Sequence, residues 1–411
     1  MAKICPKLMT GNGRDIKVIL ILNPGSSTIK FALYSLKKSL NVLYRGKVAD
    51  IGGAAKVTIY NADNTVIYSA AVKVADHRAA FSLVFKHSLQ LESDKTIAAV
   101  GHRVVHGGHI FDGAVVIDDD VIRDIASLQP LATLHQQNSL LAIELVEQTW
   151  PGTRQIACFD TAFHHSMPKV EQQVAIDKEL VTEEVRRYGF HGLSYQYIAQ
   201  QLPHYMGKKL ADSRVIVAHL GNGASLCAMT NRQSRATTMS FSPLDGLTMG
   251  TRCGSIDPGL LLYLQQHKNI CLEKLSDSLN YQSGLKALSG GSSDMQTLLA
   301  SSRTEDKNAV EHFVYQLTKH IGAMAAAIAG VDAIVFTGGI GENSALLRQQ
   351  VCQQMSWLGL ELDKAANQAC HPLISKKGSK VTVWAIPTNE ERYIAEQVTN
   401  LLVDDVSMKL A

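Results

Sequence analysis

Hydrophobic residues near the start of the chain gather in short β-branched runs that alternate with brief polar turns. Four runs follow one another closely, at residues 17–22 (KVILIL), 29–36 (IKFALYSL), 42–48 (VLYRGKV) and 56–60 (KVTIY). Runs of this length and composition, separated by short turns, predict neighbouring strands of an antiparallel meander.

Farther along, four near-continuous apolar runs are typical of strands buried in the centre of a sheet. They lie at residues 154–160, 214–220, 332–337 and 381–386. Apolar residues also recur at helical spacing in three longer segments, 138–150, 309–330 and 344–357. Strands that alternate with helices predict an α/β protein with a mixed sheet in each half of the chain.

Length and composition narrow the class of protein. The chain has 411 residues, more than one ordinary core accommodates, and this predicts two large domains. Hydrophobic residues make up 46% and charged residues 19%, as in globular proteins. The net charge of +3 gives no reason to expect nucleic acid or a membrane as partner, so the expected partners are small-molecule substrates.

The number and spacing of the cysteines indicate the cellular compartment in which the protein works. Seven cysteines are scattered along the chain, an odd number without a C-x-x-C pair. This pattern argues against a disulfide framework or a zinc site and favours a reducing compartment. Residues 1–15 lack the apolar core of a signal peptide, and no run of 18 apolar residues occurs. A cytoplasmic protein is therefore expected.

Two stretches share one design, in which a buried strand leads through a turn of small polar residues into a second strand. They are residues 18–35 (VILILNPGSSTIKFALYS) and 215–231 (VIVAHLGNGASLCAMTN). Each is compatible with an ordinary hairpin. Each also places small residues where backbone N–H groups can approach an anion, as a phosphate-binding loop requires. A third turn, 336–344 (FTGGIGENS), follows a strand and opens a helix, which suits an anion or a ribose and purine.

Known nucleotide-binding fingerprints are missing from the sequence. It contains no P-loop, and its G-x-G pairs lack the third glycine of a dinucleotide fingerprint. A strand, polar turn and strand, used in both halves, instead resembles the phosphate loops of the actin, sugar-kinase and Hsp70 superfamily.

Eight motifs in order sharpen this resemblance. They are NPGSSTIK (23–30), GHRVVHGG (101–108), CFDTAFH (158–164), RRYGFHG (186–192), AHLGNGAS (218–225), SPLDGLTMGTR (242–252), TGGIGEN (337–343) and PTNEE (387–391). In this order and spacing they are similar to those of the acetate kinase and propionate kinase family, from about residue 17 to the end.

The resemblance implies two related actin-like (ribonuclease H-like) domains with mixed sheets flanked by helices, and a nucleotide cleft between them. The first domain would be residues 1–160 completed by 390–411. The second would be residues 161–389 and would carry most of the nucleotide site. Family members are usually homodimers, although the sequence itself shows no dimer surface.

The implied activity is acetate kinase, a Mg²⁺-dependent reversible phosphoryl transfer between ATP and acetate that gives acetyl phosphate and ADP. Alternatives are a propionate kinase or another short-chain carboxylate kinase, a chaperone or filament protein of the same superfamily, and a family member that binds nucleotide without catalysis.

This reaction brings two anions together, so cations must offset their repulsion. The resemblance gives this role to Arg103 and Arg252, although an arginine in a surface motif is more often a solvated ion-pair partner. His191 would hydrogen-bond the phosphoryl oxygens, or else be a satisfied core histidine. His135 matches a family position in the cleft, whereas His106 and His164 are as readily structural.

Asp160 ends a buried strand, where a carboxylate needs a cation or metal partner. The family treats the matching aspartate as catalytic. Acetate is already ionised at neutral pH, so a general base has no proton to remove. The expected role of Asp160 is therefore to orient an arginine or a metal-bound water.

The family's binding residues carry over to matching positions. The implied acyl pocket contains Arg103, Val105, Leu134, Phe190 and Pro243. The implied nucleotide residues are Lys30, His219, Leu220, Gly221, Asn222, Gly223, Asp294, Met295, Gln296, Gly339, Ile340, Gly341, Glu342 and Asn343. Asn23 and Glu390 match the Mg²⁺ positions, and Mn²⁺ is a plausible substitute. Ser26 and Thr28 would complete the first phosphate grip.

Val105 stands two residues after Arg103. On an extended segment both side chains point to one side, and a branched residue at the pocket floor is expected to favour acetate over propionate.

The sequence departs from the family pattern near these positions. Gln296 replaces an arginine, which predicts weaker discrimination among purine nucleotides. Cys253 and Ser255 replace Ser and Asp, and Ala236 replaces Asp. Residues 192–195 read Gly-Leu-Ser-Tyr where Gly-Thr-Ser-His is common. These changes are expected to reduce turnover.

Overall fold

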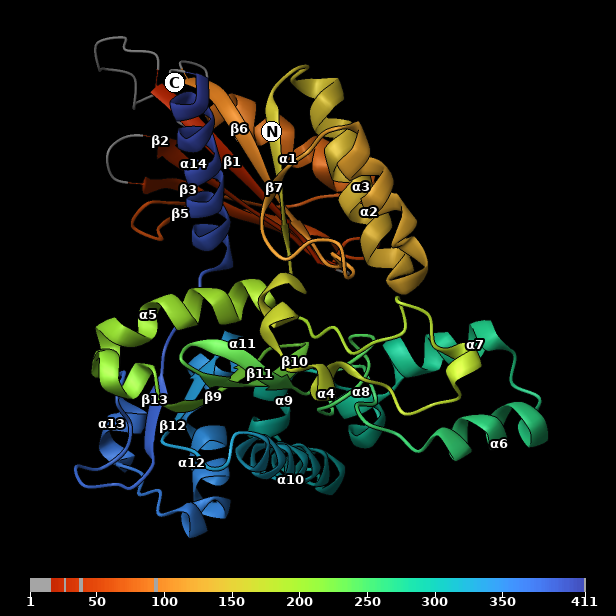
Figure 1. Ribbon diagram of the computed structural model, residues 1–411, viewed down its shortest axis with the longest axis vertical. Coiled ribbons are helices and arrows are strands. Elements are labelled where there is room, and N and C mark those ends of the chain that lie inside the picture. Colours follow the sequence, from red (N-terminus) through yellow and green to blue (C-terminus); the bar gives the residue numbers. More distant parts are fainter. Residues whose placement is uncertain (1–15, 26, 37–39, 92–94, 410–411) are drawn as a thin grey trace. The chain divides into compact units, whose positions relative to one another are not determined.

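The computed structural model describes residues 16–25, 27–36, 40–91 and 95–409, without the side chains of residues 16, 95, 133, 134 and 404–409. Its contacts divide the chain into two compact units (Figure 1). Unit 1 runs to Ala162 and resumes at Glu390, and unit 2 is Phe163–Asn389.

Unit 1 contains an eight-stranded sheet in the order β5-β4-β3-β2-β1-β6-β8-β7. The strands are β1 (Ile16–Pro24), β2 (Ile29–Leu36), β3 (Leu40–Ala49), β4 (Lys56–Asn61), β5 (Val66–Ala71), β6 (Lys95–Val104), β7 (Val115–Val116) and β8 (Arg154–Phe159). The first five pair antiparallel in sequence order, which confirms the predicted meander and adds β5, a strand that the sequence analysis missed. On the other side β1 pairs parallel with β6, and β6 with β8.

Helices pack on this sheet and close its hydrophobic core. They are α1 (His77–Leu91), α2 (Asp119–Ser127), α3 (Thr133–Thr149) and α14 (Glu390–Lys409). Helix α14, drawn in blue, contacts β1 and β6, so the end of the chain belongs to the same unit as its beginning (Figure 1). Its Ile394 and Val398 side chains are fully buried.

Unit 2 contains a five-stranded sheet in the order β11-β10-β9-β12-β13. The strands are β9 (Arg214–Leu220), β10 (Ala224–Thr230), β11 (Gln233–Thr237), β12 (Ala333–Thr337) and β13 (Thr382–Ala385). Strand β9 is central, as its apolar run predicts. The prediction of a central strand at 381–386 was wrong, because β13 is the last strand in the order. Strand β13 is nevertheless largely buried. On its other side, Leu373 forms an isolated antiparallel bridge with Trp384 of this strand.

Helices of unit 2 surround this sheet. They are α4 (Lys169–Gln172), α5 (Gly192–Ala211), α6 (Pro258–Lys268), α7 (Leu272–Asp277), α8 (Gly284–Ser289), α9 (Met295–Ala300), α10 (Thr304–Ala327), α11 (Gly338–Asn343), α12 (Ala345–Gln354) and α13 (Lys364–Gln368). The three predicted helical segments correspond to α3, α10 and α12. Helices α3 and α10 each begin five residues earlier than predicted, because polar residues form their first turns.

The two sheets repeat one strand order. Each has three consecutive antiparallel strands, β1-β2-β3 or β9-β10-β11, and two further strands that pair parallel beyond the first of them. The repeated strand–turn–strand stretches of the sequence are therefore β1-β2 and β9-β10. The fold is α/β, with a mixed sheet flanked by helices in each unit.

Gly101 sets how closely α14 packs on β6. A Cβ at this position would lie 2.7 Å from Ile394 Cγ2, 2.8 Å from Val398 Cγ2 and 2.9 Å from Ile21 Cδ1. Gly101→Ala should therefore lower the free energy of unfolding by about 1–3 kcal/mol through overpacking. Urea denaturation followed by circular dichroism measures this, with Gly113→Ala as control because a Cβ there meets no atom within 4 Å. Equal midpoints for the two variants would contradict the packing argument.

Candidate active site

The first polar turn joins β1 to β2 in unit 1. Its backbone is closed by a hydrogen bond from Gly25 N–H to the Thr28 carbonyl, 2.7 Å long. Asn23 lies opposite Lys30 in the register of the two strands, so the two residues share one face of the sheet. Ser26, which the sequence analysis placed in this turn, lies outside the described residues.

Arg103 is the centre of the polar cluster beside this turn. Its Nε donates to Asp160 Oδ1 at 2.9 Å and its Nη2 donates to Asp160 Oδ2 at 2.5 Å, a bidentate ion pair. Its Nη1 donates to Asn23 Oδ1 at 3.1 Å. The Asn23 amide in turn donates to Glu390 Oε2 at 2.9 Å and Glu391 Oε1 at 2.8 Å. Unit 1 thus gathers four predicted or neighbouring site residues around one guanidinium.

The charges of this cluster are matched. Asp160 is only 1% exposed, so its carboxylate depends on the arginine for compensation. Burial alone would lower the pKa of Arg103, but Asp160, with Glu390 and Glu391, raises it above its ordinary value. The arginine therefore stays charged, and Asp160 has the geometry of a carboxylate that orients an arginine.

In unit 2 the turn between β9 and β10 contains Gly221, Asn222 and Gly223. A Cβ on Gly223 would lie 3.3 Å from His191 Nε2 and 3.6 Å from Arg252 Nη1. A Cβ on Gly221 would lie 3.9 Å from His219 Nε2. The glycines thus allow two imidazoles and a guanidinium to face the backbone of this turn.

His191 is held in an unusual backbone conformation. It precedes α5 with φ 59° and ψ 23°, the left-handed region, which is uncommon for a residue other than glycine. Such strain is concentrated at functional sites. The ring stacks on that of His219, with centroids 4.3 Å apart, and its Nδ1 lies 2.9 Å from Ser225 Oγ.

His219 has its own hydroxyl partner. Its Nδ1 lies 2.8 Å from Ser194 Oγ, and Ser194 lies 2.8 Å from Thr388 Oγ1. Leu220 is fully buried at the end of β9. Arg252 Nη1 contacts the Pro243 carbonyl at 3.4 Å, so Pro243 lies beside the same group.

The third predicted turn forms α11, directly after β12. Gly338 packs on the Leu220 backbone with φ 78°, and a Cβ there would lie 2.8 Å from the Leu220 carbonyl oxygen. Glu342 Oε1 accepts from the backbone N–H of Gly338 at 2.9 Å and of Thr388 at 3.0 Å. Asn343 donates to the Gly339 carbonyl. Gly341 is buried and Ile340 half-buried, whereas a Cβ on Gly339 would meet only open space.

Two residues of the site were missed by the sequence analysis. Arg348 is fully buried, and its Nη1 donates to the carbonyls of Gly341 and Glu342 at 2.8 and 2.7 Å. It thereby fixes the end of α11, but an arginine in a helical pattern suggests a solvated face. Glu391 joins Asn23 as closely as Glu390 does, and its place in the PTNEE motif was the available signal.

The other predicted nucleotide residues begin α9. Asp294 caps the helix, because its Oδ2 accepts from Thr297 N–H at 2.9 Å. Hydrogen bonds from Thr297 lower the pKa of Asp294. Met295 is buried and Gln296 is exposed.

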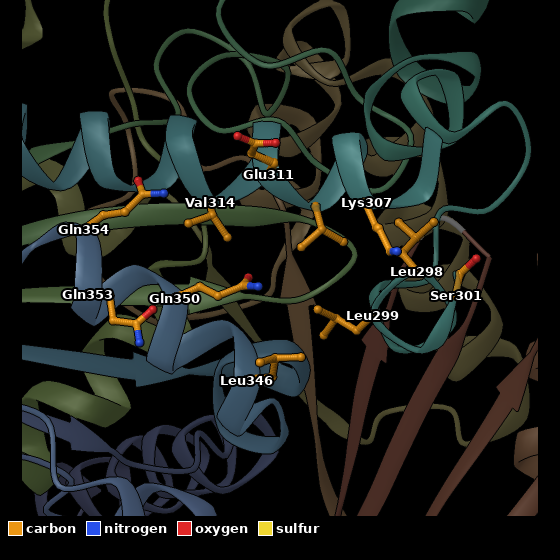
Figure 2. Close-up of a pocket in the computed structure, with 11 residues that line it drawn as sticks. Leu298, Leu299, Ser301, Lys307, Glu311, Val314, Leu346, Gln350, Gln353 and Gln354 are labelled. Carbon is orange, nitrogen blue, oxygen red and sulfur yellow. The ribbon is translucent and has the colours of Figure 1, made fainter. Parts of the chain in front are cut away.

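A separate cavity of about 650 Å³ lies between α9, α10 and α12 (Figure 2). Its described lining comes from the later part of α9 and from facing positions on the other two helices, such as Leu299, Val314 and Gln350. The predicted nucleotide residues lie elsewhere, at the start of α9 and in α11.

The predicted acyl-pocket residues are divided between the units. Val105 is buried in unit 1, but β6 ends at Val104, so strand alternation does not set its direction. Leu134 belongs to α3, and its side chain is outside the described part. Phe190 is 1% exposed and precedes His191 in unit 2.

His106 and His164 have structural surroundings. Both rings are buried, and burial lowers their pKa to about 4. His106 Nδ1 accepts from Gly108 N–H at 3.0 Å, and His164 contacts Ser234 Oγ and the Phe190 carbonyl. Among the sequence departures, Ser255 donates to Asp245 at 2.8 Å, and Ala236 is buried in β11.

Candidate metal ligands are oxygen atoms. Among the described residues, no group of three or more His, Cys, Asp or Glu could hold a metal ion. Asn23, Glu390 and Glu391 nevertheless bring an amide and two carboxylates together. Mg²⁺ favours such hard donors and keeps several waters, so it needs few protein ligands. These residues fit Mg²⁺.

Comparison with known proteins gives one consistent result. The family model described as "Acetokinase family" matches residues 18–396. The acetate kinase of Rhodopseudomonas palustris (strain ATCC BAA-98 / CGA009) is 45% identical over 390 residues, which cover 93% of this chain and 98% of that protein. The acetate kinase of Rhizobium meliloti is 42% identical, with coverage of 93% and 98%.

Solved structures agree in fold. Porphyromonas gingivalis acetate kinase superposes with a TM-score of 0.83 at 34% identity, covering 94% of this chain and 100% of that chain. A propionate kinase from Francisella tularensis superposes with a TM-score of 0.85 at 34% identity, covering 93% and 99%. Separately, none of the helices in the described residues is long and apolar enough to cross a membrane.

Proposed function

The chain belongs to the acetokinase family, and we propose that it transfers a phosphoryl group reversibly between ATP and acetate, giving acetyl phosphate and ADP. The observation that carries this proposal is the convergence of His191 Nε2 and Arg252 Nη1 beside Gly223. A hydrogen-bond donor and a cation at one glycine suit the oxygens of a phosphoryl group in transfer. The enzyme is an ATP:acetate phosphotransferase.

Arg103 holds the acetate. Asp160, Asn23 and the Pro24 carbonyl engage four of its five N–H donors, which leaves the second hydrogen on Nη2 for the substrate carboxylate. Because the ion pair with Asp160 fixes the guanidinium plane, the carboxylate meets an arginine that is already oriented. Asp160 acts through Arg103 and removes no proton.

The chemical step needs no general base. An acetate oxygen attacks the γ-phosphorus of ATP, the bond from that phosphorus to the bridging oxygen breaks, and ADP leaves with the electron pair. His191 donates a hydrogen bond to a phosphoryl oxygen, and Arg252 offsets the charge of the transferring group. The backbone of Gly221–Gly223 contacts the phosphates where no side chain intervenes.

The proposal also specifies the metal ion and the phosphoryl donor. Glu390, Glu391 and Asn23 would hold Mg²⁺, with Mn²⁺ as a substitute, and the ion supplies charge compensation for the phosphates when bound. ATP is favoured over pyrophosphate, because the open space at Gly339 leaves room for a nucleoside. The six cysteines in the described part of the chain are free thiols, which suits action in the cytoplasm.

Hydroxylamine trapping tests the function. Purified protein with ATP, Mg²⁺, acetate and hydroxylamine should accumulate acetohydroxamate, and a reaction without acetate is the control. Folded protein that yields no hydroxamate would refute the kinase assignment and favour a family member that only binds nucleotide.

Replacing Arg103 and replacing Arg252 should change different kinetic parameters. Arg103→Ala should raise KM for acetate by roughly tenfold or more while KM for ATP changes little, because the carboxylate loses a charge-assisted partner. Arg252→Ala should lower kcat by roughly 10²–10³, the typical effect of losing one stabilising donor in the transition state. Initial rates with each substrate varied measure both effects.

Arg235→Ala is the matched control, because this arginine makes an exposed hydrogen bond with Gln233. Since Arg103→Ala removes the cation that is paired with the buried Asp160 carboxylate, the comparison is made below the melting temperature of each variant. Small, equal effects from Arg103→Ala and Arg252→Ala would show that both arginines are structural.

Val105 is expected to set the preference for acetate. Discrimination by one methylene reaches roughly 10–200-fold in a hydrophobic pocket, so propionate should react more slowly than acetate. Val105→Ala should shift the ratio of kcat/KM values towards propionate, measured with acetate, propionate and butyrate. A native enzyme that prefers propionate would make this chain a propionate kinase, and Val105 would not be the determinant.

A homodimer is also part of the proposal. Helix α6 contains Leu260, Leu262 and Tyr263, at 45%, 56% and 47% exposure, and none of its residues is buried. Leu272 in α7 is 66% exposed. A helix so apolar and uncovered suits an interface with a second copy of the chain.

Leu262→Lys combined with Leu272→Lys should convert a dimer into a monomer, because burying two ammonium groups in an interface is unfavourable. Sedimentation velocity gives the mass, and Tyr315→Lys, at an exposed position of α10, is the control. Dissociation by the control alone would place the interface elsewhere.

A further inference from the structure

Inside unit 2, the hydroxyl groups of Ser225 and Tyr195 form a short hydrogen-bonded relay that ends at His191. His191 Nδ1 lies 2.9 Å from Ser225 Oγ, and Ser225 Oγ lies 2.5 Å from the Tyr195 hydroxyl. Ser225 and Tyr195 are both 0% exposed. Ser225 stands on β10 opposite His219, and Tyr195 stands on α5 one turn after His191. This relay therefore joins the candidate catalytic imidazole of His191 to two hydroxyl groups that bulk water does not reach.

The directions of the two hydrogen bonds in this relay follow from the protonation state of the Tyr195 phenol. Burial raises the pKa of Tyr195 well above its ordinary value, so the phenol keeps its hydrogen. The Tyr195 hydroxyl therefore has a hydrogen to donate. Ser225 Oγ is the acceptor at hydrogen-bond distance, and a buried hydroxyl is almost always satisfied.

Ser225 then has one hydrogen of its own. Since its oxygen accepts from Tyr195, its hydrogen is available for His191 Nδ1 at 2.9 Å. A neutral imidazole has one N–H and one acceptor nitrogen. If Nδ1 accepts, the proton is on Nε2, and Nε2 is the nitrogen that faces Gly223 and Arg252.

We propose that Tyr195 is a positioning residue that, through Ser225, holds His191 as the neutral imidazole with its proton on Nε2. The inference rests on the proposed function only in giving His191 Nε2 a phosphoryl oxygen to meet. It assigns a purpose to a position where this sequence departs from the family pattern. Tyr195 touches no substrate and acts only by choosing the tautomer.

The arrangement also opposes the other two states of the ring. With the proton on Nδ1, or with both nitrogens protonated, Ser225 would have to accept from His191 and from Tyr195 at once. Its own hydrogen would then need a different acceptor in a fully buried position. The relay thus keeps a hydrogen-bond donor aimed at the phosphate turn before substrates arrive.

The tautomer of His191 can be measured by NMR in the absence of substrates. Protein labelled with ¹⁵N-histidine, free of substrates and at neutral pH, should show an unprotonated nitrogen shift for His191 Nδ1 and an N–H shift for Nε2. The His191→Gln variant identifies these resonances by their loss. A protonated Nδ1 in the native protein would overturn the proposal.

Tyr195→Phe removes only the hydroxyl at the far end of the relay. It should move the His191 shifts towards a mixture of tautomers and lower kcat about tenfold, the effect of one hydrogen bond, with both KM values nearly unchanged. Tyr205→Phe is the matched control, because it removes one hydroxyl from a partly buried residue of the same helix. If Tyr195→Phe leaves the His191 shifts as they are, the relay does not exist.

A double-mutant cycle separates positioning from general stability. Because Tyr195 acts through Ser225, the double variant Tyr195→Phe with Ser225→Ala should have the kcat of Ser225→Ala alone. Multiplicative losses would mean two independent structural effects and would count against the relay. A protein that makes no acyl phosphate, yet changes tautomer in Tyr195→Phe, would refute the proposed function and leave the relay standing.

Discussion

The ion pair between the half-buried Arg103 and the buried Asp160 is the interaction on which the site of unit 1 depends. Asp160 follows β8, Arg103 belongs to β6, and the guanidinium also reaches Asn23 at the end of β1, which contacts Glu390 at the start of α14. One side chain therefore fixes four segments of the chain. Since Asp160 is almost fully buried, moving the arginine would break a bidentate ion pair away from water, so the orientation of Arg103 is set by folding and not by the substrate.

Unit 2 positions its two imidazoles with hydroxyl groups. There the imidazoles of His191 and His219 are held by the hydroxyls of Ser225 and Ser194, and glycines in the β9–β10 turn let them approach the backbone. The two sheets share one strand order, yet one unit positions its groups by charge and the other by hydrogen bonds. A carboxylate substrate requires a fixed cation, whereas a transferring phosphoryl group also benefits from uncharged donors aimed at its oxygens.

The strands were largely predictable because buried β-branched runs leave a strong local signal. Strand β5 was missed because its six residues are mostly exposed, and β13 was misplaced because burial by other segments resembles burial in a sheet centre. The motifs indicated Arg103, Asp160 and His191, but pairings such as Arg103 with Asp160 depend on strand register. Arg348 and the Ser225–Tyr195 contact had no sequence signal, since a buried arginine and a buried serine look like solvated ones until the packing is known.

Helix α14 has a consequence for how the protein is made. Asn23 and Glu390 are 367 positions apart, so the helix that covers β1 and β6 is translated long after these strands. All of Phe163–Asn389 is translated in between, which at about 5–20 residues per second takes roughly 10–45 s. During that interval α14 is absent, so the apolar surface of β1 and β6 that Ile394 and Val398 cover in the folded protein stays exposed.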